Sequence, residues 1–147
     1  MNERPANSVD PLRDRLERAA ADLVYSSESD YPFEFFAVDN PHDEGAMLPA
    51  TALAELVAGR VEGDRIEERS LDQFFKRHIE TSDPYDERAQ AVRPRYEALK
   101  AILRESLDGV RVIRVTRADD RAVVRCFVVG RDRQGRIAGL ATSAIET

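Results

Sequence analysis

Cysteine occurs only once in the 147 residues, at Cys126, so no disulfide can form within the chain. Cys126 lies in an alternating apolar run, Val123–Val129, and we expect it to be a small buried hydrophobic residue. No apolar run is long enough to cross a membrane, and the first residues lack the apolar stretch of a secretory signal. We therefore expect a cytoplasmic protein that makes no membrane contact.

Positive charge is also scarce. Lysine and arginine together number 22, against 28 aspartate and glutamate residues, which gives a formal net charge of −6. A nucleic-acid-binding surface is normally basic, so this acidic balance argues against a nucleic-acid partner. It is compatible with a protein partner that carries a basic cleft, because opposite charges speed encounter.

The chain lacks the spacings that mark common catalytic and metal sites. There is no CxxC, HExxH, GxSxG or phosphate-binding glycine loop. Of the two histidines, His42 sits in an acidic loop, and His78 follows Arg77 at a predicted helix end, where the helix dipole favours a positive side chain. We expect no enzymatic activity, no cofactor and no metal of its own. A small enzyme using His78 or Cys126 remains the least favoured alternative.

Hydrophobic periodicity predicts several helices. Residues 1–9 are expected to be a flexible N-terminus and residues 10–147 a single domain. Asp10-Pro11 starts a helix with an apolar stripe that extends to Leu23. Further helices are predicted over Pro49–Ala58, after the capping box Ser70–Gln73, and from Asp83-Pro84 to Leu107, the last with a kink or break at Pro94.

Strand patterns lie between and after these helices. The run Phe33–Val38 is apolar on both of its faces, and Arg65–Arg69 is a short strand candidate. Three runs, Val110–Thr116, Arg121–Gly130 and Ile137–Glu146, are joined by turns and predict an antiparallel meander. The predicted fold is α+β, an α/β/α sandwich whose central, mainly antiparallel sheet is covered by helices.

Three exposed segments remain as candidate contact sites. Glu28 lies in the polar run Ser26–Asp30, directly before the aromatic run Tyr31–Phe36, and is therefore held on a short loop beside a rigid element. Ile145 can fix the last strand in the sheet, which places Glu146 and Thr147 at one edge. The third segment is the loop Thr81–Tyr85.

The same segments carry a resemblance to a known family. SSESDYPFEFF at Ser26–Phe36 resembles the SESxYPFE segment of the nuclease A inhibitor family. Leu71–Arg77 is similar to the family's DSFFSR-type helix, and Asp132–Thr147 resembles its closing segment. The resemblance implies an α/β/α sandwich, monomeric when free, that inhibits a sugar-non-specific, metal-dependent endonuclease.

The resemblance also implies site residues. The family's metal-reaching glutamate and C-terminal threonine fall on Glu28 and Thr147, so the two residues are expected to reach the partner's magnesium, with Glu146 beside them. A glutamine and a tryptophan of the family's contact loop fall on Ser82 and Pro84, and neighbouring Tyr85 can substitute in part. This altered loop leaves an alternative open: a protein-binding module of the same fold that recognises a different partner.

Overall fold

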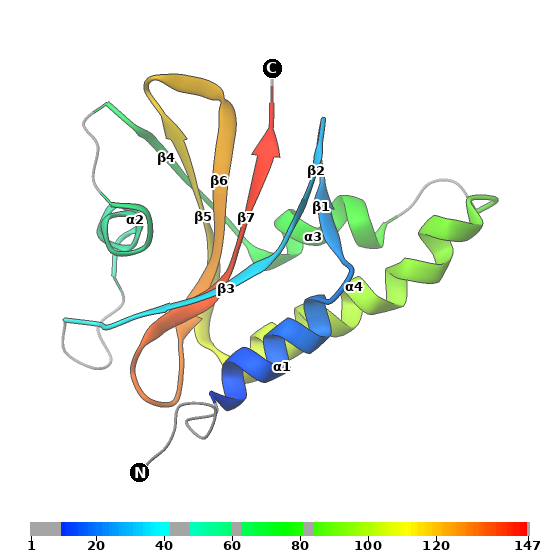
Figure 1. Cartoon of the computed structure of the whole chain (residues 1–147), viewed down its shortest axis with the longest axis horizontal. Coiled ribbons are helices and arrows are strands. Elements are labelled where there is room, and N and C mark those ends of the chain that lie inside the picture. Colours follow the sequence, from blue (N-terminus) through cyan, green and yellow to red (C-terminus); the bar gives the residue numbers. More distant parts are fainter. Residues whose placement is uncertain (1–9, 42–47, 60–62, 81–83, 147) are drawn as a thin grey trace, which may run out of the picture.

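The computed structural model describes residues 10–41, 48–59, 63–80 and 84–146. Its elements follow one another along the chain as shown in Figure 1. In order they are α1 (Pro11–Ala20), β1 (Val24–Ser26), β2 (Asp30–Pro32), β3 (Glu34–Val38), α2 (Ala50–Ala58), β4 (Arg65–Arg69), α3 (Leu71–Ile79), α4 (Glu87–Ser106), β5 (Asp108–Arg117), β6 (Asp120–Arg131) and β7 (Ile137–Ile145).

The main sheet has the strand order β3-β7-β6-β5-β4, and every neighbouring pair is antiparallel. Strands β5, β6 and β7 form the predicted meander. β7 lies between β3 and β6, and it is buried from Ile137 to Ala144. Close packing against β6 requires the glycine of β7, because a Cβ at Gly139 would stand 1.7 Å from the carbonyl oxygen of Val128.

Helices cover both faces of this sheet. One core joins α1, α3 and α4 to inward residues such as Val112, Val128 and Leu140. A second core joins α2 to residues of the opposite face, including Ile113 and Phe127. Figure 1 shows α2 on one side of the sheet and the other three helices on the other. The predicted α/β/α sandwich is therefore confirmed, and alternate residues of β3 do pack into the two different cores.

Two helix boundaries differ from the sequence prediction. α1 ends at Ala20 rather than at Leu23, because Asp22 adopts a left-handed backbone conformation (φ 64°) that turns the chain into β1. Leu23 is nonetheless buried, which explains why the apolar stripe continues past the helix.

The prediction for α4 was also wrong at its start. The helix is capped by Asp86, whose side chain accepts a hydrogen bond from the backbone N–H of Ala89 at 3.0 Å, and Pro84 lies in the preceding turn. The predicted cap Asp83 is outside the described part of the chain. No break occurs at Pro94, which is exposed within one continuous helix. Buried Tyr96, Leu99 and Leu103 hold that helix to the core.

Other sequence predictions are confirmed. β4 has the predicted bounds, α2 ends before Gly59, and the Ser70–Gln73 capping box is formed by both of its hydrogen bonds. Among the described residues, no helix is long and apolar enough to cross a membrane. The predicted flexible N-terminus, residues 1–9, and the acidic loop around His42 lie outside the described residues.

Candidate functional site

Glu28 lies at the tip of a hairpin that β1 and β2 form beside β7 of the main sheet. The hairpin is antiparallel, with Ser26 opposite Asp30. Ser27 closes the turn, since its backbone N–H and its hydroxyl both donate to the carbonyl of Ser29, each at 3.0 Å. Small hydroxyl side chains are suited to such turns because they satisfy nearby backbone groups. The polar run seen in the sequence is therefore an ordered turn with Glu28 exposed on it.

The same turn is bonded to the end of β7. The backbone N–H of Ile145 donates to the Ser27 hydroxyl at 2.9 Å, and the N–H of Glu28 donates to the carbonyl of Ile145 at 3.4 Å. Further down the strands, the Thr142 hydroxyl donates to the carbonyl of Tyr31 at 3.3 Å. These bonds bring Glu28 beside the end of β7, and Figure 1 shows the hairpin tip and the end of β7 on the same side of the molecule.

On its other side the hairpin is held by α3. Ser26 donates its backbone N–H to Nε2 of His78 at 3.0 Å, and its carbonyl accepts from the guanidinium of Arg77 at 2.7 Å. Tyr25 stacks on Phe74 with ring centroids 4.4 Å apart. Two successive side chains of α3 thus occupy both backbone groups of the residue before Ser27. The position of Glu28 is consequently fixed from two directions.

His78 differs from the sequence expectation of a positive side chain. Its pKa is lowered from the ordinary value of 6.5 to about 4, mainly by burial and also by the charge of Arg77, while the charge of Asp30 opposes these effects. The ring contacts Tyr25 and Tyr96, and its Nε2 accepts a hydrogen bond, so the imidazole is neutral near pH 7. The helix-dipole prediction was wrong because desolvation by these aromatic neighbours outweighs the dipole.

The last described residue, Glu146, is exposed, but its position is fixed. Its backbone N–H donates to the carbonyl of Ala122 at 2.8 Å, and its carboxylate forms an ion pair with Arg114. β7 extends to Ile145, as the sequence analysis required for a rigid chain end. Thr147 follows Glu146 directly and lies outside the described residues.

The predicted contact loop before α4 is described only in part. Tyr85 is 90% exposed, and Ser82 falls outside the described part of the chain. The start of α4, which follows Tyr85, projects away from the β1–β2 hairpin in Figure 1. The structure therefore brings Glu28 and Glu146 to one edge and places Tyr85 on a separate projection.

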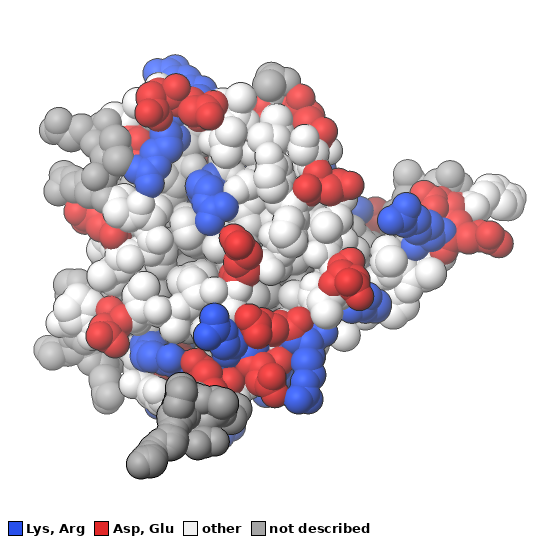
Figure 2. All heavy atoms as spheres, viewed as in Figure 1, with Lys and Arg blue, Asp and Glu red and all other residues white. Residues whose placement is uncertain are grey.

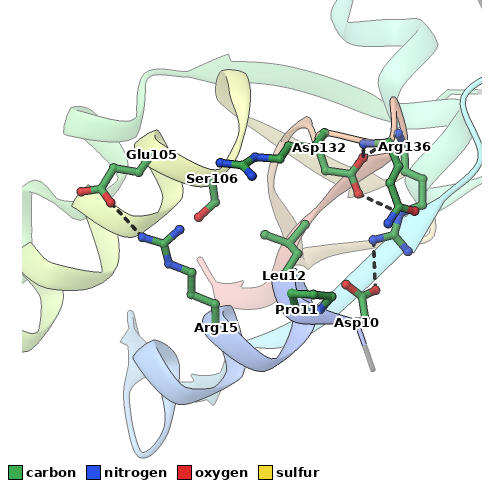
Figure 3. Close-up of a pocket in the computed structure, with 10 residues that line it drawn as sticks. Asp10, Pro11, Leu12, Arg15, Glu105, Ser106, Asp132 and Arg136 are labelled. Carbon is green, nitrogen blue, oxygen red and sulfur yellow. Dashed lines mark hydrogen bonds and ion pairs between the residues drawn. The ribbon is translucent and has the colours of Figure 1, made fainter. Parts of the chain in front are cut away.

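A concave region with a volume of about 270 Å³ lies between the start of α1, the end of α4 and the β6–β7 turn (Figure 3). Arg136 bridges Asp10 at 3.0 Å and Asp132 at 2.7 Å, while Arg15 pairs with Glu105 at 2.8 Å. These pairs join α1 and α4 to neighbouring elements. Figure 1 places this region at the end of the molecule opposite the hairpin tip. We assign it a structural role.

Cys126 has the properties of a core residue. It is 1% exposed, and burial raises the pKa of its thiol to about 11, so the reactive thiolate is not formed near pH 7. This opposes its use as a nucleophile. Within the described ranges, no group of three histidine, cysteine or acidic residues is arranged to hold a metal ion.

Comparison with known proteins identifies a family that covers nearly the whole chain. The family model described as nuclease A inhibitor-like protein matches residues 10–147. The chain belongs to the nuclease A inhibitor-like family. No curated protein matches it closely enough to serve as a named relative.

Membership in the nuclease A inhibitor-like family implies a role as an inhibitor with a nuclease as protein partner, rather than as an enzyme.

The structure adds three residues that the sequence analysis did not select as site residues: Ser27, Arg77 and His78. Ser27 was visible only as part of a polar run. Arg77 and His78 lie far from Ser26 in sequence, and nothing in the local pattern indicates that they bond to it.

Proposed function

We propose that the chain inhibits a sugar-non-specific, metal-dependent endonuclease by entering its active-site cleft with Glu28 and the C-terminal residues. The observation that carries the proposal is the bonding of the Ser27-Glu28 turn to Ile145. These bonds join two segments separated by more than a hundred residues, and we expect both segments to supply oxygen ligands at this edge. A single insertion into a cleft can then use both segments.

The chemistry of these groups fits a magnesium site on the partner. Magnesium prefers hard oxygen ligands, and it commonly keeps several water molecules through which further ligands bind. The carboxylate of Glu28 and the hydroxyl or terminal carboxylate of Thr147 would replace phosphate oxygens of the substrate. When this chain is bound in the cleft, the partner's metal would supply the electrostatic attraction, and this chain would supply only oxygen ligands.

Preorganisation supports tight binding. Both backbone groups of Ser26 and the hydroxyl of Ser27 are already hydrogen-bonded, so the turn loses little conformational freedom when it enters a cleft. The net charge of −6 favours association with a nuclease whose cleft is basic enough to hold DNA or RNA.

The test is a plasmid-digestion assay with a metal-dependent, sugar-non-specific endonuclease and excess magnesium. The purified chain should stop digestion near one equivalent per nuclease, while a metal-independent nuclease should remain active. A gel-shift control with the plasmid alone should show no binding. Unchanged digestion with no complex formed would contradict inhibition of that nuclease, and a plasmid shift would show that DNA was being masked instead.

A second candidate function is recognition of a different protein partner by the same fold. It is favoured by the departure from the family pattern at Ser82 and Pro84 and by the 90% exposure of Tyr85 on a projecting segment. The substitution Tyr85→Ala separates the two candidates. Tyr85→Ala should strongly weaken the affinity for the protein partner if Tyr85 is a central aromatic contact. It should change the affinity for a nuclease little if Glu28 and Thr147 supply most of the contact.

A further inference from the structure

Arginine side chains gather in a groove on the main sheet, beside the end of β7. The groove has a volume of about 440 Å³. Its cationic lining residues are Arg65, Arg69, Arg114, Arg117 and Arg121. Two acidic residues, Glu67 and Glu146, line it as well. We call this region the arginine groove.

The sheet register explains why these side chains meet. Arg65 pairs with Thr116, Glu67 with Arg114, and Arg69 with Val112, so the alternate residues of β4 share a face with those of β5. Val112 belongs to the core under α1, α3 and α4. Figure 1 shows these helices across the lower part of the sheet, while the β5–β6 hairpin extends past them. The face changes from apolar to arginine-rich as it leaves the helices.

Positive charge exceeds negative charge in this groove. Glu67 Oε2 is shared by Arg65 at 3.1 Å and Arg69 at 3.3 Å, so one carboxylate serves two guanidinium groups. Burial alone would raise the pKa of Glu67, but the hydrogen bond and charge of Arg69, together with the charges of Arg65 and Arg114, hold it below the ordinary value. Glu67 is therefore ionised and still leaves one of the two arginines uncompensated.

The remaining arginines of the groove also leave an excess of positive charge. Arg117 pairs with Asp64 at 3.1 Å, and Arg114 pairs with Glu146. Arg121 is exposed, and no ion pair joins it to another residue in the described ranges. Five guanidinium groups thus face three carboxylates, although the whole chain carries a charge of −6. On the face shown in Figure 2, acidic and basic side chains are interspersed.

We propose that the arginine groove binds a carboxylate-rich segment of a protein partner. Guanidinium groups bind carboxylates through paired hydrogen bonds, and they attract them more strongly where several converge. Acidic side chains on a peptide are spaced by its backbone, so they can lie between Glu67 and Glu146. A continuous polyphosphate carries a charge on every unit and would bring some of these charges against the two carboxylates, whereas acidic side chains of a peptide can be spaced around them.

The test uses a fluorescent polyglutamate peptide as the probe, with binding followed by anisotropy at low salt and by amide shifts of the isotope-labelled protein. Polyglutamate should bind, should shift amides of β4 and β5, and should dissociate at high salt. Inorganic phosphate and a short thymidine oligonucleotide serve as competing probes. Failure of polyglutamate to bind, or tighter binding of either competitor, would overturn the assignment.

The double substitution Arg65→Gln with Arg121→Gln tests the location. Glu67 keeps Arg69 as a partner, and both changed side chains are exposed, so folding should be retained. Affinity for polyglutamate should fall about tenfold. The matched control, Arg18→Gln with Arg93→Gln, removes the same charge from exposed helical positions and should change affinity by no more than about twofold. Equal losses in both variants would show that only net charge matters. The assay contains no nuclease, so its outcome is separate from that of the proposed inhibition.

Discussion

Glu28 combines an exposed side chain with a backbone that is bonded to Ile145. Alanine at this position keeps that backbone bond, so Glu28→Ala should change the free energy of unfolding by no more than about 0.5 kcal/mol. If the carboxylate reaches the partner's metal site, the same change should weaken inhibition by about 2 kcal/mol or more. Urea unfolding and plasmid digestion measure the two effects.

Glu17→Ala is the matched control for this prediction, because it removes one exposed carboxylate from α1. It should leave inhibition unchanged. Equal losses of stability and inhibition in Glu28→Ala would identify Glu28 as a structural residue of the turn and remove it from the contact surface.

Ser27 is the residue through which the hairpin and the chain end are bonded. Its hydroxyl accepts from Ile145 and donates to Ser29, so Ser27→Ala should cost about 1 kcal/mol of stability and leave the Ile145 amide without its acceptor. Amide hydrogen exchange at Ile145 should accelerate, and inhibition should weaken although no contact side chain is changed.

Ser27→Thr keeps the hydroxyl and should restore both slow exchange and inhibition. If Ser27→Ala exchanges as slowly as the native chain and inhibits as well, the bond to Ile145 does not position Glu28, and the two segments act independently.

At the scale of elements, the sequence predicted the strands better than the ends of the helices. Alternation in β3 and the turns between β5, β6 and β7 are local signals, and the structure follows them. The end of α1 depends instead on the left-handed conformation of Asp22, which has no apolar periodicity to reveal it. The short strands β1 and β2 were missed because each has only a few residues. Their ordered conformation depends on contacts with α3 and β7, which no local pattern shows.

The contact between α3 and the hairpin should make stability depend on pH through His78. Its pKa is about 4 in the folded chain and 6.5 ordinarily, so on acidification the unfolded chain binds the proton first. The contribution of neutral, buried His78 to the free energy of unfolding is therefore full above pH 6.5 and declines as the pH falls towards 4. Because the ring is partly exposed, solvent screening reduces this contribution to about 1–2 kcal/mol.

Comparing the native chain with His78→Gln isolates this contribution from the titration of carboxylates. The difference in the free energy of unfolding between the two proteins should shift against the native chain when urea unfolding is repeated at pH 4.5 instead of pH 7. A difference that stays constant over this range would mean that His78 keeps its ordinary pKa and that burial does not govern it.

At the scale of the whole molecule, the candidate site is assembled from segments far apart in the chain. The turn at Glu28 meets the end of β7, and the end of α3 supports it from the other side. Hydrophobic patterns indicate which residues are buried, but they do not show which loops share an edge of the sheet. The family resemblance suggested that Glu28 and Thr147 act together, and the structure supplies the bonds that join the Glu28 turn to Ile145, directly before Glu146.

The end of the chain provides the most specific prediction for the assembled surface. Strand β7 is buried up to Ala144, and Glu146 is held by Ala122 and Arg114, so deletion of Thr147 should leave the melting temperature almost unchanged. A C-terminal tag should also preserve the fold, but it removes the free carboxylate and obstructs entry into a cleft. Both forms should inhibit a cognate nuclease far less than the native chain. A tag added before α1 should leave inhibition unchanged, because α1 starts at the end of the molecule opposite the hairpin tip in Figure 1. If native, truncated and C-terminally tagged forms stop plasmid digestion equally well, the terminal residue makes no contact with the metal site. Glu28 would then have to act without it.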